Sequence, residues 1–157
     1  MSKPAKVQVD LSASYLAMIK NSVGSKAYRN FYGAVDGKCR DLVQGGNLSC
    51  AFFVSGILNF FDLINDPHLT VAGLIKDLEK SGWKKVRKPK EGDVLIWEPV
   101  DFTGDGVKHA HVGFYLGNEK AVSNSWKSGT PIKHHCTFGV KAGKPKRRIT
   151  AMYRHHF

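Results

Sequence analysis

A cysteine and a histidine occupy positions where a thiol nucleophile and its base could be held. Cys50 follows a Gly-Gly-Asn turn and opens the apolar run "NLSCAFFVSGIL", residues 47–58. A helix N-terminus lowers a thiol pKa because the helix dipole favours the anion, and its backbone N–H groups can hold an oxyanion. Cys50 is therefore a candidate nucleophile, with a buried structural cysteine as the ordinary alternative.

A thiol nucleophile also needs a base within hydrogen-bond reach. His111 opens the segment "HVGFYLG", whose alternating residues are typical of a strand. His109 is the rival base, two residues earlier and nearer the loop. We prefer His111 as the base and expect His109 at the rim of the cleft, among the substrate-binding residues.

The next strand-like segment, "KAVSNSW", carries polar side chains where a strand would be buried. A buried polar group needs a partner, and an imidazole N–H is one. Ser123 and Asn124 point to opposite faces, so only one can face His111 unless the strand bulges. Both therefore stay candidates for orienting the base. Trp126, at the end of this segment, and Asn47, just before Cys50, are candidate substrate-binding residues.

Helices dominate the first half of the chain. The sequence predicts an amphipathic helix over 12–24, with Ser12 or Ser14 as N-cap, then a short helical turn over 26–33 and a loop over 35–47. The apolar run from Cys50 to about residue 64 has large residues on most sides and predicts a central, buried helix. A further helix is expected after Thr70, its N-cap, with Gly82 just past its end.

Strands dominate the second half. Four short segments are rich in β-branched and aromatic residues: "DVLIWE", "AHVGFYLG", "KAVSNSW" and "RITAMYR". Helices first and strands second predict an α+β fold, with N-terminal helices packed on an antiparallel sheet.

The composition suits one compact domain. The 157 residues are 42% hydrophobic, and Lys plus Arg number 24 against 13 Asp plus Glu, for a formal charge of +11. This charge favours polyanionic partners. No apolar run is long enough to cross a bilayer. We expect a monomer spanning 1–157, with a loose N-terminal arm over 1–10. Without an apolar signal segment, we expect synthesis in the cytoplasm, and a phage-lysis, effector or other non-classical route to any cell wall.

Three blocks together resemble a known family. "NLSCAFFVSGIL", "PKEGDVLIWE" and "HVGFYLGNEKAVSNS" are similar, in order and spacing, to the NlpC/P60 and CHAP superfamily of papain-like hydrolases. In that family a cysteine starts the central helix, a "GD" strand follows, an "H.GiYlG" strand carries the base, and the next strand carries its orienting residue. The resemblance covers about residues 45–126.

The resemblance implies a thiol hydrolase. Cys50 would attack an amide carbonyl, His111 would act as base, and an acyl-enzyme would form without a cofactor. The implied substrates are peptidoglycan peptide bonds or the peptide–sugar amide. Simple register puts Ser123 at the third position, where the family usually shows His, Asn, Gln or Glu. Ser49 stands where many members have Asp.

Other motifs carry weaker signals. "DFTGDG", 101–106, fails the ligand spacing of a calcium loop, and the adjacent histidines at 134–135 and 155–156 point opposite ways along an extended chain, so no metal site is expected. The basic runs 84–90 and 141–148 lack interleaved aromatic residues, which disfavours nucleic acid as the partner. The alternative to an enzyme is the same fold with an inactive site, binding an anionic polymer through these runs.

Overall fold

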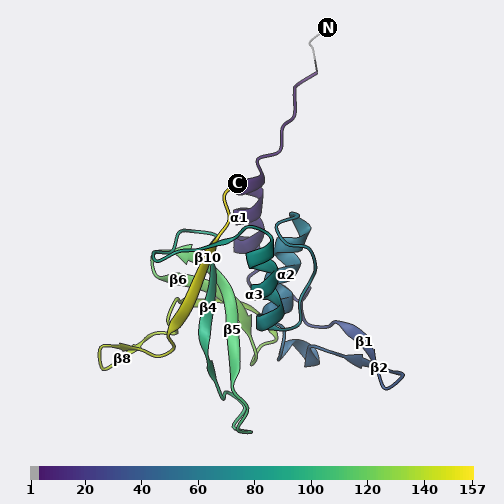
Figure 1. Cartoon of the computed structure of the whole chain (residues 1–157), viewed down its shortest axis with the longest axis vertical. Helices are drawn as coiled ribbons and strands as arrows, with labels where there is room; N and C mark the ends of the chain where they lie inside the picture. Colours follow the sequence, from purple (N-terminus) through teal and green to yellow (C-terminus); the bar gives the residue numbers. More distant parts are fainter. Residues whose placement is uncertain (1–3) are drawn as a thin grey trace.

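Helices and an antiparallel sheet form the molecule, as expected for an α+β fold (Figure 1). The computed structural model describes residues 4–157. In this part of the chain the helices are α1 (Leu11–Asn21), α2 (Cys50–Phe60) and α3 (Val71–Lys80), with a 3-10 turn η1 (Gln44–Gly46) before α2. None of these helices is long and apolar enough to pass through a lipid bilayer.

The main sheet has six strands in the order β3-β10-β4-β5-β6-β7, and every neighbouring pair is antiparallel. Its strands are β3 (Lys84–Lys85), β4 (Val94–Val100), β5 (His109–Gly117), β6 (Lys120–Ser125), β7 (Thr130–His135) and β10 (Ile149–Arg154). Two hairpins project from opposite sides of the molecule in Figure 1: β1 (Tyr32–Val35) with β2 (Lys38–Asp41), and β8 (Val140–Lys141) with β9 (Lys144–Pro145).

The two faces of the sheet bury different clusters. On one face, Val112, Phe114 and Val122 pack in the main core with the buried side of α2. On the other face, Leu95, Trp97 and Ala121 form a smaller cluster. This division follows from the alternation of side chains along each strand. It also means that two neighbouring residues of one strand have different surroundings.

The two helices beside the sheet match the apolar pattern. The α2 helix begins at Cys50, as predicted, but ends at Phe60 rather than near residue 64. Asp62, just beyond the end, has a left-handed φ of 54°, which breaks the helix. Thr70 is confirmed as the N-cap of α3, since its side chain accepts a hydrogen bond from the Gly73 N–H.

Several local predictions were wrong. Asp10, not Ser12 or Ser14, caps α1, because its carboxylate accepts the Ala13 N–H at 2.9 Å. The expected helical turn over 26–33 contains no helix, and the expected loop over 35–47 contains most of the β1–β2 hairpin. The turn of that hairpin is Asp36-Gly37, both at positive φ, and such a pair suits a tight hairpin. Its strands are mostly exposed and so lack the apolar alternation that would have predicted them.

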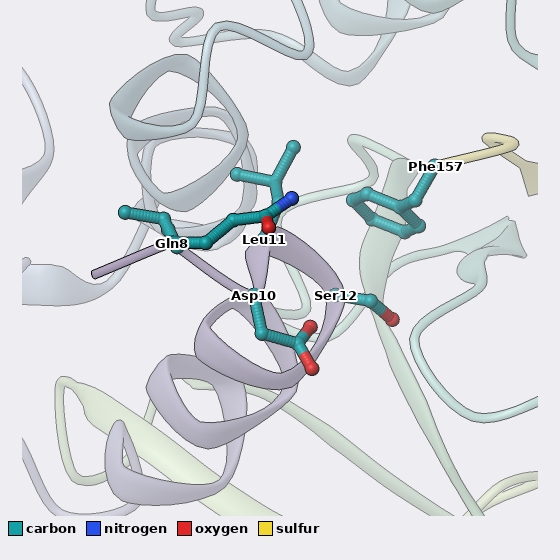
Figure 2. A pocket seen from close by; sticks show the side chains of 6 residues that line it. Gln8, Asp10, Leu11, Ser12 and Phe157 are labelled. Carbon is teal, nitrogen blue, oxygen red and sulfur yellow. The ribbon is translucent and has the colours of Figure 1, made fainter. Parts of the chain in front are cut away.

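The C-terminus lies beside the start of α1, and the arm that leads into this helix extends away from the body of the molecule (Figure 1). Of the predicted loose arm over 1–10, residues 1–3 lie outside the described residues, and 4–10 form no helix or strand. The arm and the C-terminus line a hollow with side chains that include Gln8, Asp10 and Phe157 (Figure 2). Its Asp10 carboxylate is already used as the α1 cap, so this hollow offers little chemistry.

Candidate active site

The turn before Cys50 is fixed to the sheet from two directions. Gly46, at φ 95°, lies so close to Gly129 in the β6–β7 turn that a Cβ at Gly46 would be 2.5 Å from the Gly129 carbonyl oxygen. The Asn124 side chain of β6 donates to the Gly46 carbonyl at 2.6 Å. These contacts place the start of α2 against the end of β6 and the β6–β7 turn.

Cys50 and His111 line the same cleft, which has a volume of about 230 Å³. The three predicted substrate-binding residues, Trp126, Asn47 and His109, also line it. The remaining lining residues are Leu48, Leu69, Thr70, Val71, Phe102, Ala110 and Asn124. Within the described residues, no hydrogen bond joins Cys50 to His111. Such contacts are often long without substrate and shorten when it binds.

Aromatic side chains form one wall of the cleft. The rings of Phe102 and Trp126 lie 5.5 Å apart, and His109 packs on Phe102 at 5.2 Å. Trp126 remains 41% exposed, so it stands at the rim. A flat apolar group entering the cleft would contact this wall.

Ser123 is the residue that contacts the His111 imidazole. Its hydroxyl lies 2.8 Å from the His111 Nε2 and 2.8 Å from the Nε2 of His134 on β7. The His134 Nδ1 lies 2.8 Å from the His135 carbonyl oxygen. Three side chains from three adjacent strands therefore form one hydrogen-bonded chain that ends on the backbone.

Asn124 has a different task. The bulge that would turn it toward the imidazole is absent, because β6 pairs with β7 in unbroken register from Lys120 to Ser125. Its side chain instead holds the turn before Cys50 through Gly46. Its Oδ1 atom is buried and has no partner among the described residues.

Two aromatic rings enclose the hydrogen-bonded chain. The Trp97 ring lies 5.5 Å from the His111 ring and 5.8 Å from that of His134. Phe138 stacks on His134 at 4.1 Å and also reaches His111 at 5.8 Å. This apolar enclosure limits the access of water to the two imidazoles.

Burial dominates the electrostatics of the thiol. It raises the pKa of Cys50, although the N–H groups of Val112 and Ala51 and the positive charge of Arg147 act in the opposite direction. The expectation that the helix N-terminus would lower this pKa was therefore wrong in its net direction. The dipole effect is present, but the desolvation cost of a thiolate is larger here.

Burial is also the main cause of the shifted pKa of the proposed base, His111. With the nearby positive charge of Arg147 and the neighbouring His134, it lowers the pKa of His111 to about 3. Burial likewise lowers the pKa of His134. At neutral pH the pair is therefore a thiol and a neutral imidazole, not a thiolate and an imidazolium.

Arg147 is a site neighbour that the sequence did not single out. Its Nε donates to the Glu98 carbonyl at 3.0 Å and its Nη2 to the His109 carbonyl at 2.8 Å. It belongs to the basic run 141–148, where the surrounding lysines point to solvent. Its charge favours a thiolate at Cys50 and disfavours an imidazolium at His111.

His134 was also missed, because it lies in the "HH" pair that the sequence left without a role. A usable signal was present: the turn at 126–129 predicts that the chain returns beside "KAVSNS". In the structure Ala121 pairs with His134, which makes His134 a diagonal neighbour of Ser123.

The two carboxylates of the loop at 101–106 accept hydrogen bonds from nearby backbone N–H groups. Asp101 accepts the N–H groups of Gly104 at 2.7 Å and Gly106 at 2.8 Å. Over residues 4–157 no group of three or more His, Cys, Asp or Glu side chains has the arrangement of a metal site.

Comparison with known proteins adds no family to this geometry. No protein-family model matches the chain, and no curated protein matches it.

Proposed function

We propose that this protein is a thiol hydrolase with a papain-like fold of the NlpC/P60–CHAP type. The observation that supports it best is the shared cleft of Cys50 and His111, with the imidazole held from behind by Ser123. Cys50 stands at the N-terminus of α2 and His111 lies two residues past the start of β5, close to the arrangement that the resemblance over residues 45–126 implies.

The proposed reaction starts from the neutral pair. His111 removes the thiol proton as the Cys50 sulfur attacks the carbonyl carbon, so that the S–H bond breaks while the S–C bond forms. The protonated imidazole then delivers a proton to the leaving amine, and water hydrolyses the thioester. The Ala51 and Val112 N–H groups and the Arg147 charge, which already favour a thiolate, would favour the negative charge that develops during attack.

The cleft restricts the part of the substrate that enters it. Its lining contains no Asp, Glu, Lys or Arg within the described part of the chain. An uncharged group with apolar or aromatic surface therefore fits best. The charged groups of a cell-wall peptide would lie beyond the rim, where the Lys127 amine stands 5.7 Å from the Trp126 ring centroid.

The activity can be tested on defined amides. The protein would be incubated with muropeptides and with N-acyl amides of neutral acids, and the products identified by mass spectrometry. A matched Cys50→Ala variant is the control. The proposal expects new amines and acids with wild type alone. Equal products from Cys50→Ala, or no cleavage of either substrate set, would contradict it.

One observation favours a binding module as the second candidate. The β8–β9 hairpin and the residue after it expose Lys141, Lys144 and Lys146, and none of these forms a salt bridge within the described residues. An anionic polymer could neutralise them. Binding would then weaken steeply with salt, and replacing the three lysines with glutamine would remove it.

A further inference from the structure

We propose that His134 is a positioning residue for the base: through the Ser123 hydroxyl it holds His111 with Nε2 protonated and Nδ1 free. The inference rests on the proposed function for its catalytic meaning, but the tautomer it assigns to His111 can be measured without any reaction. It explains how a serine, Ser123, can orient the base at a position where the resembling family usually has His, Asn, Gln or Glu.

The direction of the hydrogen-bonded chain follows from its last member. A carbonyl oxygen can only accept, so the His134 Nδ1, 2.8 Å from the His135 carbonyl oxygen, must carry a proton. In the neutral imidazole the other nitrogen, Nε2, is then an acceptor. Since Nε2 lies 2.8 Å from the Ser123 oxygen, the serine hydroxyl donates to it.

The same reasoning reaches His111. Because the Ser123 hydroxyl donates its hydrogen bond to His134, the serine oxygen is an acceptor toward His111, whose Nε2 lies 2.8 Å away. The His111 Nε2 must therefore carry a proton, and in the neutral ring Nδ1 keeps the lone pair. Within residues 4–157 no partner occupies this Nδ1, and His111 lines the cleft that contains Cys50. The free nitrogen is the one available to take the thiol proton.

Within the described residues, no carboxylate belongs to the hydrogen-bonded chain of His111, Ser123 and His134. The charged or titratable groups that face it are Arg147, whose charge acts on His111, and His135, whose charge acts on His134. When His111 gains a proton at Nδ1, its Nε2–H bond to Ser123 becomes charge-assisted and strengthens. The hydrogen bond that the Ser123 hydroxyl donates to His134 keeps its O–H turned away from His111, so that the serine oxygen faces His111 as an acceptor at that moment. With His134 behind it, the Ser123 hydroxyl oxygen serves as the acceptor for the His111 Nε2–H. An amide or carboxylate oxygen at the Ser123 position would accept that hydrogen bond directly.

The central test replaces His134 with Leu and with Gln. The Gln side-chain oxygen can accept from Ser123 as the imidazole nitrogen does, whereas Leu fills the space beside Phe138 and accepts nothing. His68→Gln is the matched control, because His68 hydrogen-bonds to Asp77, outside this hydrogen-bonded chain. Two quantities are measured in each variant: the His111 tautomer, from long-range proton–nitrogen NMR spectra, and the rate of Cys50 acylation by a neutral activated ester across pH.

The expected results separate positioning from stability. Wild type, His134→Gln and His68→Gln should show His111 protonated at Nε2. His134→Leu should show a mixture of tautomers and acylate about 10-fold or more slowly at every pH, with Gln restoring most of the rate. If His134→Leu does not fold, Ser123→Ala breaks the same link with a smaller change and should give the same two effects.

Two outcomes would overturn the inference. One is a folded His134→Leu or Ser123→Ala variant that retains the Nε2–H tautomer and acylates within two-fold of wild type. The other is a wild-type His111 protonated at Nδ1. If wild type does not acylate at all but loses the Nε2–H tautomer on His134→Leu, the positioning role stands and the hydrolase proposal fails.

Discussion

Two histidine networks in this molecule differ in the charge of the group that contacts the imidazole. His68 pairs directly with the Asp77 carboxylate at 2.7 Å, whereas His111 meets only the Ser123 hydroxyl and, through it, a second imidazole. A histidine backed by an aspartate is the familiar form of a catalytic pair. Here that form lies in the network without a nucleophile.

The surroundings explain the difference. Asp77 also accepts from the Asn65 and Asp66 N–H groups and from the Ser81 hydroxyl, so its oxygens hold the segment 65–68 against α3. Although burial acts to raise it, the hydrogen bonds from His68, Asn65 and Asp66 hold the pKa of Asp77 well below its usual range. The hollow beside this network has no cysteine among its lining residues. Position relative to a nucleophile, rather than the presence of a carboxylate, distinguishes the two networks.

The largest expected effect comes from removing the nucleophile. Cys50→Ala should reduce acylation of the protein by a neutral nitrophenyl ester by about 10³-fold or more, because Cys50 is the thiol that lines the cleft of His111. Release of nitrophenol measures it. Cys39→Ser is the control, since Cys39 is exposed on β2. A Cys39→Ser variant that loses as much activity would contradict the assignment.

Removing the base should have the next largest effect. His111→Gln is expected to slow acylation of Cys50 by about 10²- to 10⁴-fold, the usual contribution of a positioned general base. His68→Gln, in the other network, should leave the rate within two-fold. Stopped-flow measurement at pH 7 compares them. Equal losses in both variants would mean that the histidines matter only for folding.

Disrupting the Asp77 network should instead cost stability. Asp77→Asn removes the charge that accepts hydrogen bonds from His68, Asn65 and Asp66, and should lower the free energy of unfolding by about 3 kcal/mol. Urea denaturation measures this change. The acylation rate of the folded variant should stay near that of wild type. A large loss of rate with unchanged stability would reverse the roles given to the two networks.

The response to acid should also differ between the networks. An unfolded histidine titrates near pH 6.5, but His111 in the folded protein titrates near 3. Below about pH 6.5 the unfolded state therefore binds more protons, and the free energy of unfolding falls as the pH falls toward 3. Asp77, with a lowered pKa, loses its contribution only below about pH 4.

Denaturation between pH 7 and 4.5 isolates the histidine contribution. The free energy of unfolding of wild type should fall by on the order of a few kcal/mol over this range, with His111 and His134 acting in the same direction. The free energy of unfolding should fall clearly less in His111→Gln, and by as much as in wild type in Asp77→Asn. Identical slopes for wild type and His111→Gln would show that His111 is not buried in its neutral form.

The smallest effect is expected at the rim of the cleft. Trp126→Ala should lower the preference for a phenylacetyl over an acetyl ester by about 5-fold, because the Phe102–Trp126 wall then loses one ring. Trp126→Phe should keep most of the preference. Ratios of the acylation rates give the answer directly. An unchanged ratio in Trp126→Ala would place the acyl group elsewhere.

Much of the fold was predictable from local pattern. The apolar run after Cys50 and the Thr70 cap located α2 and α3. Enrichment in β-branched and aromatic residues, together with alternation in the segment of β5, located β4, β5, β6 and β10. The β1–β2 hairpin and β7 were missed because edge and exposed strands lack that alternation, and β7 carries a proline that an edge strand tolerates.

The candidate site was predictable only in part. Cys50 begins α2 and His111 lies near the start of β5, two elements with clear patterns, but the sequence left both Ser123 and Asn124 as candidates for orienting the base. His134 and Arg147 belong to segments far along the chain, and only the sheet order and the path after β9 bring them to the site. The direction of the shift in the Cys50 pKa depends on how far the folded surroundings desolvate the thiol, which no local sequence pattern reports.

The most direct test is the site of acylation. Wild type and His111→Gln would each be treated with a neutral activated ester at pH 7, and the acyl group located by peptide mass spectrometry on Cys50, Cys39 and Cys136. We predict one acyl group per wild-type chain, on Cys50, formed much faster than on the exposed Cys39 and lost in His111→Gln. Acylation that favours Cys39, or that reaches Cys50 equally fast without His111, would contradict a Cys50–His111 active site.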